Sequence, residues 1–270
     1  MNNYTNKNRL NWDERVALHV ASEFYDLDTF KAGGNSLKSL ECEELGDVSG
    51  ETLLHLQCHF GMDTLSWARR GAIVTGVDFS EQAITQAKAL ALEQNHNAQF
   101  IACDIYELPR HLRGEFDIVF TSYGVLCWLG DLSRWAQIIA SFLKPGGRFY
   151  IVDSHPTGNL FDEESKGAFS VRYSYFNIGP ERYESDVSYT DSASKLKNTV
   201  TYEWSHSLGK IVNAVLEAGL QLQFLHEFTF AGYWKLPWME QGTDGWWRLP
   251  NGDTRIPFLF SLMAIRAQIP

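Results

Sequence analysis

Between residues 52 and 154 the sequence alternates short apolar runs with segments of helical periodicity. The apolar runs predict strands at 52–57, 72–78, 98–104, 116–123 and 148–154. Helices are predicted over 62–70, from Ser80 to about Glu93, and from Asp131 to the KPGG of 144–147. Ser80 and Asp131 are residue types that cap helix N-termini. Apolar strands separated by helices predict a parallel sheet that is covered on both faces, with right-handed crossovers.

This rhythm pauses after residue 155 and then resumes. Residues 156–204 are polar and tyrosine-rich without clear periodicity, and a helix is predicted over 206–218, ended by Gly219. No helical pattern separates the strand-like runs 220–230 and 257–267, so we expect them to pair antiparallel at the sheet edge. The aromatic segment 231–256 between them is predicted to project as a loop.

The chain is therefore expected to contain one α/β core with additions. We predict an N-terminal helical cap segment over 1–47, a core formed by 48–155 and 205–270, and an insertion over 156–204 that covers a substrate site. The apolar content of 44% and charged content of 21% are typical of a soluble globular protein.

Charge and cysteine content exclude several classes of protein. The formal net charge is -10 without any Lys/Arg cluster, which argues against nucleic acids and anionic membranes as partners. The four cysteines show no CxxC spacing, so neither a metal site nor a disulfide framework is expected. No apolar run is long enough to cross a bilayer, and the N-terminus lacks the apolar core of a signal peptide. We therefore expect a cytoplasmic protein.

Polar residues follow the predicted strands where ligands bind in an open α/β sheet, outside the carboxyl ends of the strands. Asp78 lies 21 residues beyond Gln57, a spacing at which a carboxylate accepts hydrogen bonds from ribose hydroxyls. Asp104 could accept a hydrogen bond from an adenine amino group, with Phe79 and Ile105 on either side of the ring. The full set of strand-end residues is Gln57, Cys58, His59, Gly61, Asp78, Asp104, Ser122 and Tyr123.

These segments resemble class I S-adenosylmethionine-dependent methyltransferases over about residues 50–155 and 205–267. The resemblance lies in LLHLQCHFGMDTLSWARRG, GVDFSEQAI, CDIYELP, FDIVFTSYGVLCWLGD and LKPGGRFYIVD. It implies a three-layer Rossmann-like fold with a mostly parallel seven-stranded sheet and an antiparallel C-terminal edge strand. It also implies S-adenosylmethionine as cofactor and S-adenosylhomocysteine as product.

The resemblance assigns roles to the strand-end residues. The loop from Gln57 through Cys58 and His59 to Gly61 would pass under the methionine part of the cofactor. Asp78, beside Phe79 and Ser80, would hold the ribose, and Asp104 with Ile105 would receive the adenine. Ser122 and Tyr123 would face the sulfonium.

The first motif departs from the family pattern. His55 stands where an acidic residue is usual, and Gln57 and His59 stand at glycine positions. We interpret His55 as a hydrogen-bonded core residue, and Cys58 and Trp135 as packing residues. The methionine end therefore needs other partners, and Trp12 and Arg15 are candidates. Arg15 could bind a carboxylate bidentately or lie on the surface of an amphipathic helix.

Methyl transfer from a sulfonium is an in-line displacement, and a general base is needed only for a protonated acceptor. His155 is the best candidate for that base, followed by His206 and Tyr123, although a structural role is favoured for each. Aromatic residues in 1–47, 156–204 and 231–256 predict a lid over a small molecule, or a cage for an ammonium group. The candidate substrate-binding residues are Tyr123, Trp128, His155, Tyr175 and Trp204.

Two other functions are weighed against a methyltransferase that acts on a small-molecule acceptor. The altered first motif favours a protein that binds S-adenosylmethionine or S-adenosylhomocysteine without turnover. The spacing of Asp78 favours an NAD-dependent oxidoreductase, but the absence of GxGxxG and the final antiparallel strand oppose it. We expect a monomer or a homodimer, because an edge built from the last two strands could support dimerisation.

Overall fold

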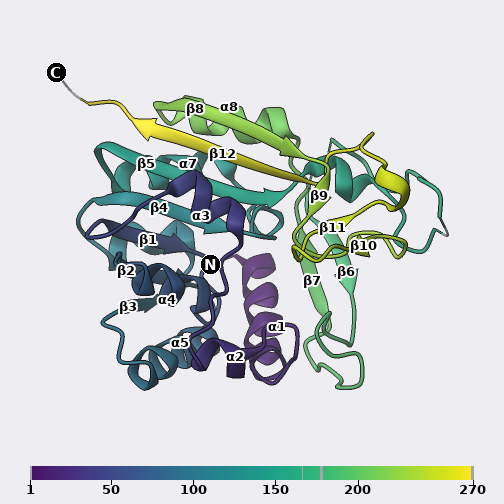
Figure 1. The fold of residues 1–270 in the computed structure, drawn as a ribbon, viewed down its shortest axis with the longest axis horizontal. Coiled ribbons are helices and arrows are strands. Elements are labelled where there is room, and N and C mark those ends of the chain that lie inside the picture. Colours follow the sequence, from purple (N-terminus) through teal and green to yellow (C-terminus); the bar gives the residue numbers. More distant parts are fainter. Residues whose placement is uncertain (1, 166, 177–178, 269–270) are drawn as a thin grey trace.

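A seven-stranded sheet forms the centre of the protein (Figure 1). The computed structural model describes residues 2–165, 167–176 and 179–268. The strand order is β3-β2-β1-β4-β5-β12-β8. The strands are β1 Thr52–Leu56, β2 Ile73–Asp78, β3 Gln99–Ala102, β4 Phe116–Ser122, β5 Leu143–Ser154, β8 Leu220–Phe228 and β12 Leu259–Arg266.

The predicted mostly parallel sheet is confirmed. Strand β1 pairs in parallel with β2 and β4, and β12 pairs antiparallel with both β5 and β8. The last strand is therefore the antiparallel one, as expected, and it lies one position in from the edge, which β8 forms. All carboxyl ends of β1 to β5 consequently meet at one border of the sheet.

Helices cover both faces of this sheet. Leu54 and Leu56 of β1 pack on one face with Trp135 of α7, whereas Leu53 packs on the other with Trp67 of α4. The alternation follows from the period of two in a strand, and Trp135 is fully buried as predicted. The helices are α3 Ser39–Leu45, α4 Met62–Arg69, α5 Glu81–Glu93, α6 Leu108–His111, α7 Leu132–Phe142 and α8 Leu208–Glu217.

The caps predicted for two of these helices are present. The Ser80 side chain accepts a hydrogen bond from the Ala83 N–H, and the Asp131 side chain accepts one from the Arg134 N–H. Helix α7 ends at Phe142, just before KPGG as predicted, but the predicted start of the next strand at 148 was wrong, because KPGG lies inside β5. Pairing of Phe116 with Leu143 starts the strand early, and a register shift absorbs the extra residues.

The two segments without clear periodicity have secondary structure of their own. The expected loop 231–256 was wrong in part, since β9 Phe230–Ala231, β10 Glu240–Gln241 and β11 Trp247–Arg248 form a small antiparallel sheet. Within the insertion, β6 Glu181–Glu184 pairs antiparallel with β7 Val200–Glu203. Short 3-10 helices complete these regions and the core: Ile105–Glu107, Leu126–Trp128, Pro156–Leu160 and Pro250–Gly252.

The N-terminal region places a long helix beside the insertion. Helix α1 Asn3–Val20 stands next to β7 (Figure 1), and α2 Leu27–Lys31 follows it. The Asn8 side chain hydrogen-bonds to both the N–H and the C=O of Tyr202, each at 2.7 Å. Asn11 donates to the Asn198 carbonyl at 2.5 Å. These contacts fasten α1 along β7, so that α1 faces the carboxyl ends of the central strands.

Candidate functional site

The loop after β1 has the backbone of a glycine-rich turn without its glycines. Gln57 and His59 have φ values of 57° and 49°, in the left-handed region that glycine favours. Gly61, at φ 82°, cannot be replaced freely, because a Cβ there would lie 2.9 Å from the Phe100 ring. The loop therefore follows a tight path in which two residues other than glycine adopt the left-handed conformation.

Asp78 ties this loop to the second strand. Its Oδ2 accepts a hydrogen bond from the His59 N–H at 2.8 Å, and its Oδ1 accepts one from the Ser80 N–H at 2.9 Å. Burial raises the pKa of Asp78 to about 6, although both hydrogen bonds oppose this shift. Ser80 Oγ donates to Asp13 Oδ1 at 2.7 Å, which links this strand end to α1.

Asp104 lies at the end of the neighbouring strand β3. Its Oδ1 accepts the Tyr106 N–H at 2.9 Å, and burial raises its pKa. Ile105 is buried and Phe79 is half-buried at the same border. The structure thus brings the residues predicted to hold ribose and adenine to the ends of two adjacent strands.

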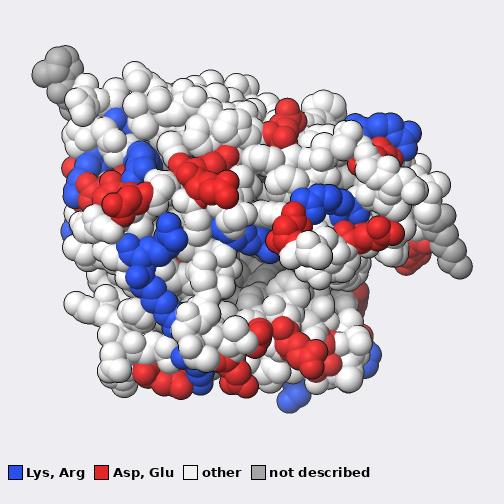
Figure 2. Space-filling view, viewed as in Figure 1, with Lys and Arg blue, Asp and Glu red and all other residues white. Residues whose placement is uncertain are grey.

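Helix α1 brings Trp12 and Arg15 to the same border. The Trp12 ring lies 5.3 Å from the His59 ring and 5.4 Å from the Trp128 ring, edge to face in both cases. The Arg15 guanidinium lies 5.6 Å from the Trp12 ring centre and 6.0 Å from that of Tyr189. Arg15 is therefore enclosed by aromatic side chains rather than exposed on an amphipathic helix. Figure 2 shows a hollow in the surface beside α1.

Several buried polar atoms in this region have no hydrogen-bond partner among the described residues: Asn11 Oδ1, Trp12 Nε1, Arg15 Nε and Gln57 Oε1. Buried polar groups in proteins are normally partnered, so such a cluster indicates groups that a ligand completes. Three of the four belong to residues predicted to bind the cofactor. The residues present thus fit a polar ligand with several hydrogen-bonding groups.

A histidine pair that sequence reasoning missed joins α1 to the first loop. His19 Nδ1 and His59 Nε2 are 2.8 Å apart, and His19 Nε2 is 2.9 Å from Ser188 Oγ. Burial lowers the pKa of His19 to about 3 and that of His59 well below its usual value, so both are neutral at pH 7. His55, in contrast, is buried and hydrogen-bonded to Thr64 Oγ1 at 2.8 Å, as predicted.

Two carboxylates near the end of β4 were also missed. Asp63 accepts hydrogen bonds from Ser36 Oγ at 2.6 Å and from Ser122 Oγ at 3.3 Å, and burial raises its pKa. Glu41 accepts the Tyr123 hydroxyl at 2.8 Å, and burial raises its pKa to about 7. The Tyr123 hydroxyl is thus hydrogen-bonded to a residue of α3. Tyr123 comes directly after β4, and its backbone φ is 46°.

The candidate bases and substrate residues are not all brought together. His155 is buried, with Nδ1 2.8 Å from Thr157 Oγ1 and Nε2 2.8 Å from Glu227 Oε1. His206 Nε2 is 2.7 Å from the Leu129 carbonyl, and the Tyr175 hydroxyl accepts the Leu208 N–H at the start of α8. These three residues have structural hydrogen bonds, whereas Trp128 contacts Trp12 and therefore belongs to the α1 side of the site.

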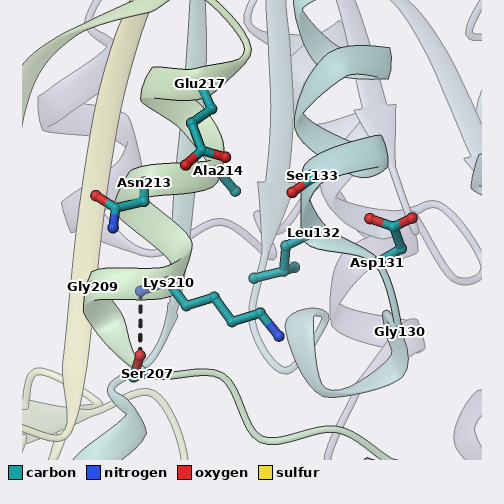
Figure 3. A pocket seen from close by; sticks show the side chains of 10 residues that line it. All are labelled: Gly130, Asp131, Leu132, Ser133, Ser207, Gly209, Lys210, Asn213, Ala214 and Glu217. Atoms are coloured by element: carbon teal, nitrogen blue, oxygen red, sulfur yellow. Dashed lines mark hydrogen bonds between the residues drawn. The ribbon is translucent and has the colours of Figure 1, made fainter.

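A separate pocket of about 530 Å³ lies between the N-terminal end of α7 and one side of α8 (Figure 3). Lys210 extends from α8 toward α7 across it, and Ser207 accepts the Lys210 N–H. We call this the outer pocket; its lining residues are Gly130, Asp131, Leu132, Ser133, Ser207, Gly209, Lys210, Asn213, Ala214 and Glu217. None of the residues predicted from sequence to bind cofactor or substrate lines it.

The sheet order and the strand-end residues together define a Rossmann-like methyltransferase fold. Residues 53–147 match the family model of a methyltransferase domain. Solved structures share the fold. An S-adenosylmethionine-dependent methyltransferase from Mesorhizobium loti is 21% identical with a TM-score of 0.57, covering 83% of this chain and 94% of that one. The glycopeptide N-methyltransferase MtfA, solved with S-adenosylmethionine, is 14% identical with a TM-score of 0.53, covering 84% and 91%.

Curated relatives match over a shorter length. A ubiquinone biosynthesis O-methyltransferase from Aeromonas salmonicida is 31% identical over 109 residues, which are 40% of this chain and 45% of that protein. One from Saccharophagus degradans is 29% identical over 147 residues, 53% of this chain and 62% of that protein. The chain thus spans about half the length of the curated relatives it matches. Residues 53–147 thus resemble a methyltransferase domain, and the chain shares the fold of solved S-adenosylmethionine-dependent methyltransferases.

Proposed function

We propose that the protein transfers the methyl group of S-adenosylmethionine to a small-molecule acceptor. The observation that carries this proposal is the group of unpartnered buried atoms on Trp12, Arg15 and Gln57, which lie where α1 meets the first loop. A cofactor with an amino-acid end offers both donors and acceptors to such atoms. Bound there, S-adenosylmethionine supplies a methyl group activated by the positive sulfonium.

Arg15 is proposed to bind the methionine carboxylate. An arginine has five N–H donors and no acceptor, and among the described residues Arg15 has no hydrogen bond or ion pair. Its two aromatic neighbours hold the guanidinium in place without neutralising it. A carboxylate between Arg15 and the first loop would therefore supply the missing charge.

Asp63 is proposed to bind the ammonium group of the same cofactor. Its carboxylate is held by two serine hydroxyls, and no cation lies within ion-pair distance among the described residues. Both Asp63 and Arg15 act electrostatically on Tyr25, so the two charges lie on the same side of the site. Asp63 thus offers the negative charge that His55 does not provide in the first motif. Asp78 is proposed to bind the ribose of the cofactor, and Asp104 its adenine.

The protein would then promote methyl transfer by enclosing the cofactor and aligning the acceptor with it. Trp12, Trp128 and the insertion exclude water from the sulfonium side, which favours in-line displacement by an acceptor held at contact distance. The relatives' names mention a ubiquinone O-methyltransferase and a glycopeptide N-methyltransferase, so they support methyl transfer without agreeing on an acceptor. An enclosed site walled by tryptophan and tyrosine side chains supports a small one.

Calorimetric titration with 5′-methylthioadenosine separates these roles, because that compound lacks the carboxylate and the ammonium group. We expect Arg15→Met and Asp63→Asn to weaken S-adenosylhomocysteine binding about 10- to 100-fold, since a charged hydrogen bond contributes about 1.5–3 kcal/mol. Binding of 5′-methylthioadenosine should stay unchanged in both variants. The matched control Arg255→Met, on the exposed surface, should bind both compounds normally.

Other outcomes decide between the alternatives. Equal losses for both compounds would mean that Arg15 and Asp63 support the fold rather than the methionine end. Binding of NADH in place of S-adenosylhomocysteine would favour an oxidoreductase. Tight S-adenosylmethionine binding without any S-adenosylhomocysteine formation across a broad acceptor panel would favour a binding protein without turnover.

A further inference from the structure

Lys235 is a half-buried cation without an ion-pair partner among the described residues. It lies between β9 and β10, and its Nζ donates to Asn159 Oδ1 at 3.0 Å and lies 4.9 Å from the centre of the Tyr233 ring. Neither contact is an ion pair. No carboxylate of the described residues lies within the ~4 Å of an ion pair. A half-buried ammonium group without a counter-charge offers a binding position for an anion.

Glu203, in contrast, is a carboxylate without a partner among the described residues, and it belongs to β7. It ends β7, and the adjoining Trp204 N–H donates to the Cys127 carbonyl at 2.8 Å, which fixes this end of β7 against the chain that follows β4. The Glu203 carboxylate has neither a hydrogen bond nor an ion pair with any described residue. Burial raises the pKa of Glu203 to about 6, and the positive charges of Lys235 and Arg15 oppose the shift.

Both residues face the border of the sheet where methyl transfer is proposed. The Tyr233 hydroxyl, next to Lys235, is 3.0 Å from Ser154 Oγ at the end of β5. Lys235 and Glu203 both act electrostatically on Cys127, after β4. They also act on each other while remaining farther apart than an ion pair. A cation and an anion are thus held apart across the carboxyl ends of β4 and β5.

We propose that the methyl acceptor carries both an anionic group, bound by Lys235, and a protonated amine or hydroxyl that hydrogen-bonds to Glu203. Amino acids and hydroxy acids have this combination. The inference rests on the proposed methyl transfer and names its acceptor class. A neutral or purely cationic acceptor would cover the half-buried Lys235 without supplying a counter-charge, which costs free energy.

The transfer step balances with these groups alone. The bond between the methyl carbon and sulfur breaks as the bond from that carbon to the acceptor's nitrogen or oxygen forms. Sulfur keeps the electron pair and becomes a neutral thioether. The acceptor's proton passes to the Glu203 carboxylate and then to solvent, so Glu203 acts as the general base.

Matched acids and amides test the anionic group. The probes are 3-hydroxybenzoate, phenylalanine and 3-aminopropanoate, each with its primary amide, added to the full chain with S-adenosylmethionine. Product is measured as S-adenosylhomocysteine, and binding is measured by calorimetry in protein saturated with S-adenosylhomocysteine. We expect at least one acid to bind and react with a KM about 10- to 100-fold below that of its amide.

Lys235→Met should remove this preference by raising the KM of the acid, with the amide unaffected. Lys210→Met, which removes a lysine from the outer pocket, is the matched control and should change neither. Both variants should retain wild-type affinity for S-adenosylhomocysteine, because Lys235 does not bind the cofactor. If the wild-type protein itself does not bind S-adenosylhomocysteine, the proposed function fails instead.

Glu203→Gln tests the base. We expect kcat to fall while KM changes little, and the decrease in kcat below about pH 6 to disappear. The charged or titratable neighbours that act on Glu203 are Arg15, Cys127, Glu163, Glu181, Tyr183 and Lys235. The inference is overturned if acids and amides behave alike in the wild type, or if no acid binds to protein that binds S-adenosylhomocysteine.

Discussion

The outer pocket and the hollow beside α1 differ in whether their polar groups have partners. The outer pocket between α7 and α8 has a volume of about 530 Å³, and its polar residues either cap helices, as Asp131 does, or are exposed, as Lys210 and Glu217 are. The region beside α1 instead contains the unpartnered buried atoms of Trp12, Arg15 and Gln57. Since solvent already satisfies an exposed group, only the second region has hydrogen-bonding capacity that a ligand would fill. The outer pocket and the region beside α1 are therefore distinguished by buried polar atoms without partners rather than by volume.

The largest expected effect contrasts one aspartate from each region. Asp78→Asn should weaken S-adenosylhomocysteine binding by more than about 100-fold, because two charge-assisted hydrogen bonds are lost at about 1.5–3 kcal/mol each. Asp131→Asn should leave binding and stability unchanged, since asparagine caps helices as well as aspartate does. Calorimetric titration of both variants makes the comparison. Similar losses in the two would show that the outer pocket also contributes to cofactor binding.

The next contrast uses two asparagines. Asn8→Ala removes both hydrogen bonds to Tyr202 and leaves a part-buried N–H and C=O without these partners, which should cost about 1–2 kcal/mol. Opening of α1 should become about 5- to 30-fold more frequent, as measured by amide hydrogen exchange. Asn213→Ala, at the exposed outer pocket, should not change exchange anywhere in α1. Unchanged exchange in Asn8→Ala would mean that other contacts hold α1 in place.

A pH titration of ligand affinity tests the role of Asp78. Burial raises its pKa to about 6 from an ordinary 3.8, so the carboxylate becomes protonated as the pH falls through 6. Affinity for 5′-methylthioadenosine, which has no amino-acid groups to titrate, should then fall by up to about 10-fold per pH unit. Stability of the ligand-free protein should show the opposite sign. A raised folded-state pKa contributes stability below pH 3.8 that is lost as the pH rises through about 6.

Asp78→Asn should remove both trends. If the variant retains the loss of affinity at low pH, another group, such as Asp104 with its own raised pKa, is responsible.

The smallest effect is expected at Lys210. Its ammonium group is exposed, so Lys210→Gln should change the free energy of unfolding by no more than about 0.5 kcal/mol. Affinity for S-adenosylhomocysteine should remain that of the wild type. Thermal unfolding with and without S-adenosylhomocysteine measures both. A clear loss of ligand stabilisation would remove the distinction between the two hollows.

The fold was largely predictable because its signals are local. Periodicity located the strands and helices, and the cap at Ser80 and the buried Trp135 followed from residue type and spacing. The start of β5 was missed because pairing with β4 decides it, and nothing within KPGG itself does. Strands of two residues such as β9 and β10 are too short to produce a pattern.

The site was predictable only where a strand end contributes to it. Asp78 and Asp104 could be placed by topology, because each directly follows a strand. His19, Asp63 and Lys235 reach the site through contacts between distant parts of the chain, such as the 40 residues that separate His19 from His59. Each of these side chains belongs to an ordinary helix or loop in the sequence, and only the assembled fold shows which polar groups surround it.

The docking of α1 on β7 has a consequence for the order of synthesis. Asn8 and Asn11 are made before their partners Tyr202 and Asn198, which follow 194 and 187 positions later. At typical translation rates of about 5–20 residues per second, α1 waits about 10–40 s for the strand on which it docks. A nascent chain can therefore form the central strands before α1, which carries Trp12 and Arg15, has docked on β7. Closure around the cofactor becomes available only after the insertion has been made.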